Sequence, residues 1–329
     1  MASPGLRLIP MVTESSRSKD VPSLIKSSFF QLTPDKVLSA LESHGYLTTG
    51  RYRTLNSYEN RVFDVELENQ SESLIVKFYR PHRWSQETIL EEHSFLQELK
   101  EEGIPVAAPL LLRETSTLWN HDGLWMAVFP KIRGRLVEEI LPPQVPQLGR
   151  WLARLHNIGS KKNALHRPTL KPNPARLELL KPHIPMELWH QYRQLAENVF
   201  TFLDSALPRF KHIRVHGDFH RGNLIWNNDW TLIDFDDFLM APAAQDLWLI
   251  LSQLSEEEQT IFVEAYQELR AWDPEEHFIL EPLRAYRIVH YSTWIAERWE
   301  DPSFPNLFPN FHDYNFWTSE ILELQKIIE

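Results

Sequence analysis

The sequence predicts an α+β protein with two lobes: a small N-terminal lobe built on an antiparallel sheet and a larger helical C-terminal lobe. Two observations support this prediction. From about Ser57 to Phe129, apolar residues recur with the period of β-strands, interrupted by one helix. From about Val137 onward the helical period dominates, apart from short apolar runs around Asp218. We expect five strands in the sheet of the N-terminal lobe.

The boundary between the lobes is expected where an apolar strand runs into Pro130 and Gly134. A chain of 329 residues with 43% hydrophobic residues is long enough to form two cores. We therefore expect a flexible leader at 1–29, an N-lobe at 30–130 and a helical C-lobe at 131–329.

Charge and composition narrow the possible partners. The formal net charge of −11 disfavours nucleic acid, because non-specific binding to it depends on Lys and Arg neutralising phosphates. The absence of cysteine excludes thiolate catalysis and cysteine-ligated metals. The most apolar later window, 247–254, is much shorter than the roughly 20 residues of a membrane span, and the first 30 residues lack a signal peptide's apolar region. We expect a cytoplasmic monomer that binds neither membrane nor nucleic acid.

Three segments of the N-terminal lobe are assigned from their patterns. Residues 63–68 alternate apolar and acidic side chains, as a half-buried strand does. Residues 74–79 form a second strand, which is apolar on both faces except for Lys77. Residues 85–102 have the pattern of a helix with Ser85 as its N-cap.

Two charged residues interrupt these apolar patterns: Lys77 in its strand and Glu92 on the inward face of the helix. Because an isolated buried charge is costly, the two side chains can serve as partners for one another. The residues alone leave two interpretations open. Lys77 contacts ATP phosphates and is held by Glu92, or both are solvated charges at the edge of the sheet and the margin of the helix.

In the C-terminal lobe, helical periods predict helices at 145–156, 186–205, 256–269, 281–299 and 316–328. Residues 301–314, with three Pro and three Phe, are expected to be an ordered loop packed by aromatic rings. Short apolar runs predict strands at 213–215, 224–226 and 230–233.

The most informative stretch lies among these short strands. It reads HGDFHRGN at residues 216–223 and is followed by Leu-Ile-Asp at 232–234. The stretch supplies Asp218, Asn223 five residues later, and Asp234. Such side chains are what phosphoryl transfer needs to activate a hydroxyl and to hold Mg²⁺ on ATP.

The strands at 224–226 and 230–233 are expected to form a hairpin. If Asn228 and Asp229 are a two-residue loop, Asn223 lies directly opposite Asp234. That pairing would bring an amide oxygen and a carboxylate to one magnesium site, and would leave Asp218 free to face the incoming hydroxyl. A different loop length would shift the register.

HGDFHRGN followed by IDFDD resembles the catalytic loop and metal-binding segment of the aminoglycoside phosphotransferase and choline kinase group, a branch of the protein-kinase-like fold. LNSYENRV at 55–62, VKFYRP at 76–81, IPVAAP at 104–109 and EPLRA at 281–285 resemble the bacterial stress response kinase A family. The resemblance spans roughly residues 30–325 and implies a bilobal fold with ATP between the lobes.

The resemblance also implies an activity: ATP-dependent phosphorylation of Ser or Thr hydroxyls on proteins, in the cytoplasm, as part of a stress response. It assigns Asp218 and Asp234 as catalytic residues, with Asp218 as the base. Asn223 and Asp234 would bind Mg²⁺. Asp246 would brace the catalytic loop.

For ATP, the resemblance implies that Ser57 contacts the phosphates, that Lys77 pairs with Glu92, and that adenine bonds to backbone near 129–132. One departure concerns the turn over the phosphates. Residues 55–61 contain no glycine, so backbone and the Ser57 hydroxyl must replace a glycine-rich loop.

Other functions stay open. Metal-dependent phosphoesterases use a similar pattern of Asp, His and Asn ligands, which here would be His216, Asp218, His220 and Asn223. Such a site needs further clustered histidines. We interpret His216 as a structural anchor and leave His220 unassigned. A pseudokinase is a second alternative, although every expected catalytic side chain is present.

A small-molecule kinase is the strongest alternative, because one fold hosts several substrate classes. Its pocket would be built from the C-terminal helices. There Arg284, Arg287 and Tyr291 follow at helical spacing, and Asp236 and Asp237 lie beside the metal. These arginines either line a substrate groove or are ordinary paired charges.

Overall fold

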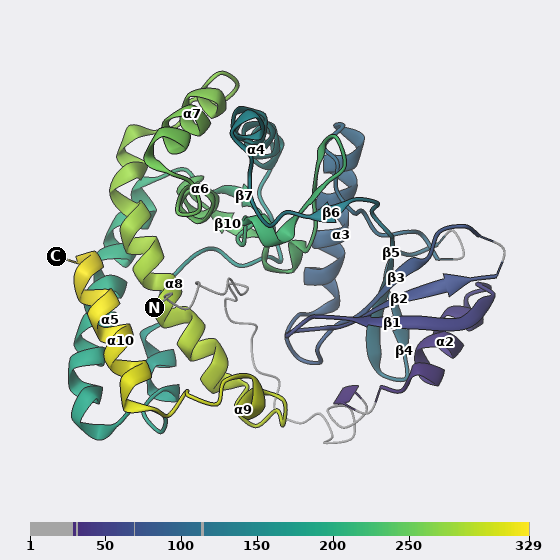
Figure 1. Ribbon diagram of the computed structural model, residues 1–329, viewed down its shortest axis with the longest axis horizontal. Helices are drawn as coiled ribbons and strands as arrows, with labels where there is room; N and C mark the ends of the chain where they lie inside the picture. The colour runs from purple at the N-terminus through teal and green to yellow at the C-terminus, as the bar shows by residue number, and fades with distance from the viewer. Residues whose placement is uncertain (1–28, 31, 69, 113–114, 329) are drawn as a thin grey trace.

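A five-stranded antiparallel sheet forms the N-terminal lobe of the computed structural model, which describes residues 29–30, 32–68, 70–112 and 115–328 (Figure 1). The strands are β1 (Thr48–Leu55), β2 (Arg61–Leu67), β3 (Leu74–Phe78), β4 (Trp119–His121) and β5 (Leu124–Pro130), in the order β1-β2-β3-β5-β4. The predicted number of strands is confirmed. Of the expected leader at 1–29, only Phe29 is described, and it is buried.

Strand β3 lies at the centre of this sheet, so Lys77 is not on an edge strand. Lys77 pairs with Val62 on one side and with Ala127 on the other. The period of two places the neighbouring Val76 on the opposite face, in the apolar cluster under helix α2 (Pro34–Ser43). Lys77 therefore projects from the face that α3 covers.

Helix α3 (Gln86–Glu101) matches the helix expected in this lobe. The Ser85 hydroxyl accepts a hydrogen bond from the Thr88 backbone N–H at 3.2 Å, as expected of an N-cap. Glu92 is buried on the inward face of α3 among Ile89 and Leu96. The helix therefore brings a carboxylate under the sheet.

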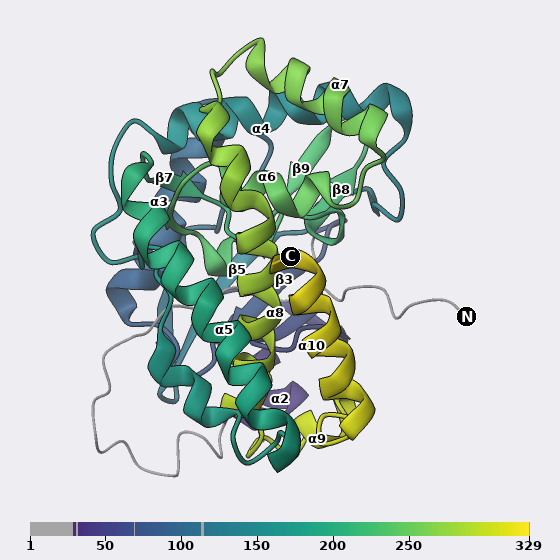
Figure 2. The same ribbon diagram turned by 90° about the vertical axis from the view of Figure 1, so that its left-hand side faces the viewer.

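The C-terminal lobe is helical (Figures 1 and 2). Its helices are α4 (Val145–Gly159), α5 (Met186–Ala206), α6 (Ala244–Leu251), α7 (Glu256–Gln267), α8 (Leu280–Glu297), α9 (Phe304–Leu307) and α10 (Tyr314–Ile328). The five predicted helices correspond to α4, α5, α7, α8 and α10. The loop expected at 301–314 contains α9, whose Phe304 packs against Trp294 of α8. Helices α5 and α10 pack along α8 (Figure 2).

Five short strands support the segment that carries the sequence motif. They are β6 (Arg135–Leu136), β7 (Ile213–Val215), β8 (Leu224–Trp226), β9 (Trp230–Leu232) and β10 (Leu239–Ala241), paired as β6-β8-β9 and β10-β7.

None of the described helices is both long and apolar enough to cross a membrane.

Candidate active site

The loop at 216–223 connects β7 to β8 and is hydrogen-bonded to helix α6. The Asp246 carboxylate accepts hydrogen bonds from the backbone N–H groups of His216 and Gly217, each at 2.8 Å. Gly217 has φ of +85°, and a Cβ there would lie 2.3 Å from the Asp237 carbonyl oxygen. Only glycine fits this turn without displacement. Asp246 therefore braces the loop, as the sequence predicts.

His216 also has a structural role, as expected. Its Nε2 lies 3.1 Å from the Ile233 carbonyl oxygen, and its Nδ1 accepts from the Asp218 backbone N–H at 3.2 Å. The imidazole thus ties the loop to the strand that precedes Asp234. This bond fixes the separation between the two halves of the motif.

Asp218 is buried, and both of its carboxylate oxygens have partners. Arg287 of α8 donates to Oδ1 at 3.0 Å, while Asn223 donates to Oδ2 at 3.3 Å and His220 lies 3.3 Å from it. Burial would raise the pKa of Asp218, but Arg287 and His220 outweigh it and hold that pKa below its ordinary value. The carboxylate is therefore ionised and fixed in orientation.

The hairpin register differs from the one predicted. Trp226 pairs with Trp230, so the loop has three residues and not two. The Ile233 N–H donates to the Asn223 carbonyl at 3.0 Å, so Ile233 and not Asp234 stands opposite Asn223. The extra loop residue, at which Asn228 adopts positive φ, shifts every pair by one. The predicted direct pairing of Asn223 with Asp234 is wrong.

Asp234 reaches the site by a backbone turn. It follows the last residue pair of the hairpin and has the left-handed values φ 63° and ψ 66°. Its Oδ1 lies 3.5 Å from Lys77 Nζ. The Asp234 side chain is 45% exposed, but its enclosure by the site still raises its pKa; Lys77 opposes this effect, and the charges of Asp236 and Asp218 add to it. Asp234 and Asp218 are thus close enough to sense each other's charge.

Lys77 joins the lobes at the centre of the site. Its Nζ lies 3.8 Å from Glu92 Oε1 and is hydrogen-bonded to Asp236 of the C-terminal lobe. Burial would lower the pKa of Lys77, but Asp236, Glu92 and Asp234 together raise it above the ordinary value. Burial raises the pKa of Glu92 to about 7, against the opposing charge of Lys77. The predicted contact between Lys77 and Glu92 is present.

Asp236 is the partner that sequence reasoning missed. Its buried carboxylate also accepts from the Asn60 amide and from Arg83, the latter at 3.2 Å. Arg83 donates in addition to Asp237 at 2.6 Å. The sequence indicates that Asp236 and Asp237 lie near the site, because they follow Asp234 by two and three residues. Nothing in the sequence connects them to Arg83.

Ser57 lies in the turn between β1 and β2 and is exposed. Its hydroxyl oxygen accepts from the Asn60 N–H at 3.1 Å, which closes the turn. A contact of Ser57 with phosphate remains a prediction.

The two arginines considered for a substrate groove have different surroundings. Arg287 binds Asp218, as described above. Arg284 bonds to Glu281 at 3.2 Å and to Glu323, and it borders a pocket of about 720 Å³ next to the catalytic loop. His220, Arg221 and Gln253 line the same pocket.

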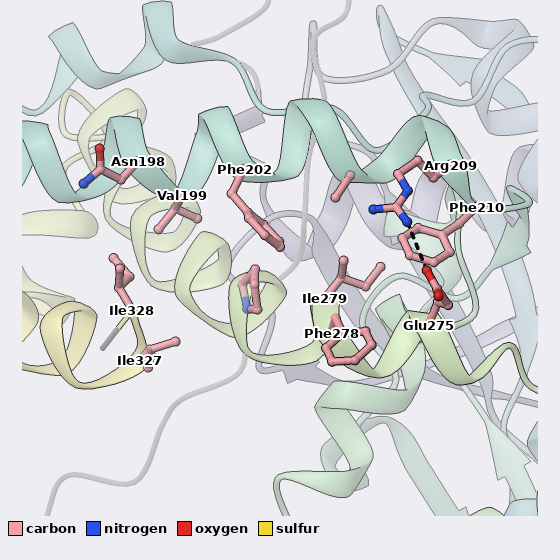
Figure 3. Close-up of a pocket in the computed structure, with 12 residues that line it drawn as sticks. Asn198, Val199, Phe202, Arg209, Phe210, Glu275, Phe278, Ile279, Ile327 and Ile328 are labelled. Carbon is pink, nitrogen blue, oxygen red and sulfur yellow. Dashed lines mark hydrogen bonds and ion pairs between the residues drawn. The ribbon is translucent and has the colours of Figure 1, made fainter.

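A second pocket, of about 500 Å³, lies between α5, the short helix at Pro274–Ile279 and the end of α10 (Figure 3). Its walls are apolar, with Phe202 and Phe278 among them, and an ion pair of Arg209 with Glu275 at 3.0 Å closes one end. It contains none of the residues of the motif.

The donor set of the site suits a hard divalent cation. The Asn223 amide nitrogen donates to the Asp218 backbone carbonyl at 3.0 Å, which leaves its amide oxygen available. Asp234, 45% exposed at its side chain, is reachable and sits among like charges. In the described part of the chain no three His, Asp or Glu side chains form a metal site by themselves. A cation held by Asn223 and Asp234 would therefore share its remaining positions with phosphate and water.

Two lobes with this constellation between them define a phosphotransferase of the kinase-like class. The chain belongs to the phosphotransferase enzyme family, whose model matches residues 51–283, and within it to the stress response kinase A family. Its activity is phosphoryl transfer to a hydroxyl group. This membership decides against the phosphoesterase interpretation and confirms the resemblance seen in the sequence.

The relatives agree over nearly the whole chain. Stress response kinase A of Escherichia coli K12 is 36% identical over 314 residues, 92% of this chain and 95% of the relative. The serine/threonine protein kinase RdoA of Salmonella typhimurium is 35% identical over 313 residues, with the same coverage. Among solved structures, an amicoumacin kinase in complex with AMP-PNP, Ca²⁺ and Ami has a TM-score of 0.73 at 18% identity, covering 89% of this chain and 95% of that one.

The brace at Asp246 gives a first prediction. In Asp246→Asn one carboxylate oxygen becomes an amide, so one of the two loop N–H groups loses its acceptor. We expect a loss of about 1–3 kcal/mol in the free energy of unfolding, measured by urea denaturation, and a larger fractional loss in phosphate transfer. The control is Asp204→Asn, an exposed aspartate on α5, which should change neither. Normal transfer by Asp246→Asn would exclude the brace.

Proposed function

We propose that this protein is an ATP- and Mg²⁺-dependent serine/threonine protein kinase that transfers the γ-phosphoryl group to a protein hydroxyl. The observation that carries the proposal is the meeting of buried Asp218 with Asp234 and Lys77 between the lobes. The same proposal includes a stress-response role in the cytoplasm and action as a monomer.

The residues would divide the work between phosphate and acceptor. Lys77, held by Glu92, would contact the phosphates, and Ser57 would approach them from the turn above. Asn223 and Asp234 would hold Mg²⁺, which neutralises charge on the phosphates. Backbone near 129–132, at the end of β5, would bond to adenine.

Asp218 would orient the acceptor hydroxyl more than abstract its proton early. A carboxylate whose pKa lies below the ordinary value is a weak base, yet it is a strong hydrogen-bond acceptor. Phosphoryl transfer passes through a loose transition state in which little proton abstraction is needed before bond formation. A low pKa at Asp218 is therefore compatible with this reaction, and a fixed orientation is what it requires.

The relatives support a protein acceptor, since one of them is named a serine/threonine protein kinase at 35% identity. A small-molecule kinase is the second candidate. It is favoured by the amicoumacin kinase structure and by the pocket of about 720 Å³ beside His220, which is large enough for a metabolite.

The acceptor is tested with labelled ATP offered to generic Ser- and Thr-containing proteins, to the enzyme itself, and to amino alcohols and aminoglycosides. We expect label in protein, on Ser or Thr, and far less of it when the Asp218→Asn enzyme is used. Transfer to a metabolite alone would overturn the protein-kinase proposal and leave the phosphotransferase activity standing.

Asp218→Asn keeps the size of the side chain and removes its charge. We expect transfer to fall by about 10²–10⁴-fold, while the affinity for ATP, measured by calorimetry, stays within a few-fold of the unmodified protein. Near-normal transfer would show that another group orients the hydroxyl.

Asp234→Ala removes one of the two side chains assigned to the metal. We expect ATP binding to lose its dependence on Mg²⁺, because the remaining amide oxygen of Asn223 is a weak ligand by itself. Calorimetric titrations with ATP, with and without Mg²⁺, measure this dependence. If it is unchanged in the variant, the metal assignment is wrong.

A further inference from the structure

The turn between β1 and β2 is anchored in the opposite lobe through Glu59. This carboxylate is 3% exposed. It accepts hydrogen bonds from Arg298 at 3.0 Å and from the indole N–H of Trp294 at 2.9 Å. Trp294 lies in α8 and Arg298 directly follows that helix. A residue of the turn that precedes β2 is thus bound to the end of a C-terminal helix.

The backbone of the turn is tied to the same region. Arg80, which follows β3, donates to the carbonyl oxygens of Tyr58 and Glu59, each at 3.0 Å. The same guanidinium donates to Asp301 at 3.1 Å, a few residues beyond α8. Both the side chain and the carbonyls of the turn therefore lead to the segment around the end of α8.

Asn60 completes the anchoring of the turn. Its amide oxygen accepts from the Arg80 backbone N–H at 3.1 Å, and its amide nitrogen donates to Asp236. Its own backbone N–H closes the turn on the Ser57 hydroxyl oxygen. Ser57 is thus an exposed residue of a turn in which Glu59 and Asn60 are buried and hydrogen-bonded.

A carboxylate with this little exposure is stable only when its charge is balanced. Burial would raise the pKa of Glu59, but Arg298, Arg83 and Arg80 together lower it to about 2. Three arginines, one of them from the C-terminal lobe, thus balance a single carboxylate of the turn. The arrangement also explains how a turn without glycine is kept in one conformation: side-chain bonds fix it where a glycine-rich loop would rely on backbone adaptability.

We propose that Glu59 is a positioning residue for the nucleotide: by binding Arg298 and Trp294 it holds the Ser57 turn in place for the β- and γ-phosphates of ATP. The inference rests on the proposed ATP site. It assigns to the end of α8 a part in nucleotide binding, although α8 belongs to the C-terminal lobe and carries Arg287 at the catalytic aspartate.

An ion pair that only stabilises the fold would have the same contacts. The test therefore needs a measurement that a change in the stability of the fold does not alter. We call the contact of Glu59 with Arg298 and Trp294 the clamp. The clamp acts on the turn over the phosphates and not on the adenine end of the site. Its loss should therefore weaken ATP and ADP and leave adenosine unaffected. A general loosening of the fold would weaken all three or none.

The experiment compares affinities of the full chain for ATP, ADP and adenosine by calorimetry with Mg²⁺, well below the melting temperature. In Glu59→Gln we expect ATP affinity to fall about tenfold or more, as for a lost hydrogen-bonded charge, with adenosine affinity within twofold of the unmodified protein. The Michaelis constant for ATP should rise in parallel, and that for the acceptor should not.

The matched control is Glu276→Gln. Glu276 is also a buried glutamate that accepts from a tryptophan indole, Trp272 at 3.2 Å, and from the Ala244 N–H at 2.7 Å, but it lies outside the site. This variant should keep the ratio of ATP to adenosine affinity. Arg298→Lys, which retains the charge, should reproduce the selective loss in weaker form and decides the matter if Glu59→Gln does not fold.

Two results would overturn the clamp: unchanged ATP affinity in folded Glu59→Gln or Arg298→Lys, or an equal loss for ATP and adenosine. Failure of the ATP site itself gives a different result, because the unmodified protein would then show no preference of ATP over adenosine. The two failures are therefore separable in one set of titrations.

Discussion

The site depends on the hydrogen bonds that the buried carboxylate of Asp236 accepts from the N-terminal lobe. This carboxylate is 1% exposed and accepts from Lys77, Asn60 and Arg83, all from the N-terminal lobe. Removing any one donor would leave a buried charge under-compensated, which makes the three contacts mutually dependent. Because Asp236 follows Asp234 by two residues, the lobe contact and the residue proposed to bind the metal belong to one short turn. Asp236 thus sets the distance between Lys77 and Asp234, because it is bonded to the first and lies two residues after the second.

The sequence was sufficient for the parts that depend on local pattern. Lys77 and Glu92 interrupt apolar periods, and an interrupted period indicates a charge with a partner; the structure places them 3.8 Å apart. Asp246 was expected to brace the loop and does so. The predicted hairpin loop was one residue too short, because Asn228 and its neighbours permit two-residue and three-residue loops alike. Since successive side chains of a strand alternate between its faces, this small error produced a wrong pairing.

What the sequence could not give are contacts between distant segments that show no pattern. Glu59 and Arg298 are 239 residues apart, and each by itself is an ordinary surface type of residue. Helix α6 was missed for a related reason: every residue from Ala244 to Leu251 is buried, so it has no polar face to mark a helical period. Burial on all sides removes the signal from which amphipathic elements are read.

The two aspartates of the motif acquire different properties from their surroundings and not from their order in the chain. Arg287 and His220 hold the pKa of Asp218 below its ordinary value, whereas partial enclosure and the charges of Asp236 and Asp218 raise that of Asp234, still 45% exposed, against the pull of Lys77. A carboxylate stabilised as an anion by fixed donors is suited to accept a hydrogen bond from a hydroxyl. One whose charge is opposed by its neighbours gains most from a cation. Environments that push the pKa values of two like groups apart favour separate roles, which supports the proposal that Asp218 orients the hydroxyl and Asp234 holds the metal.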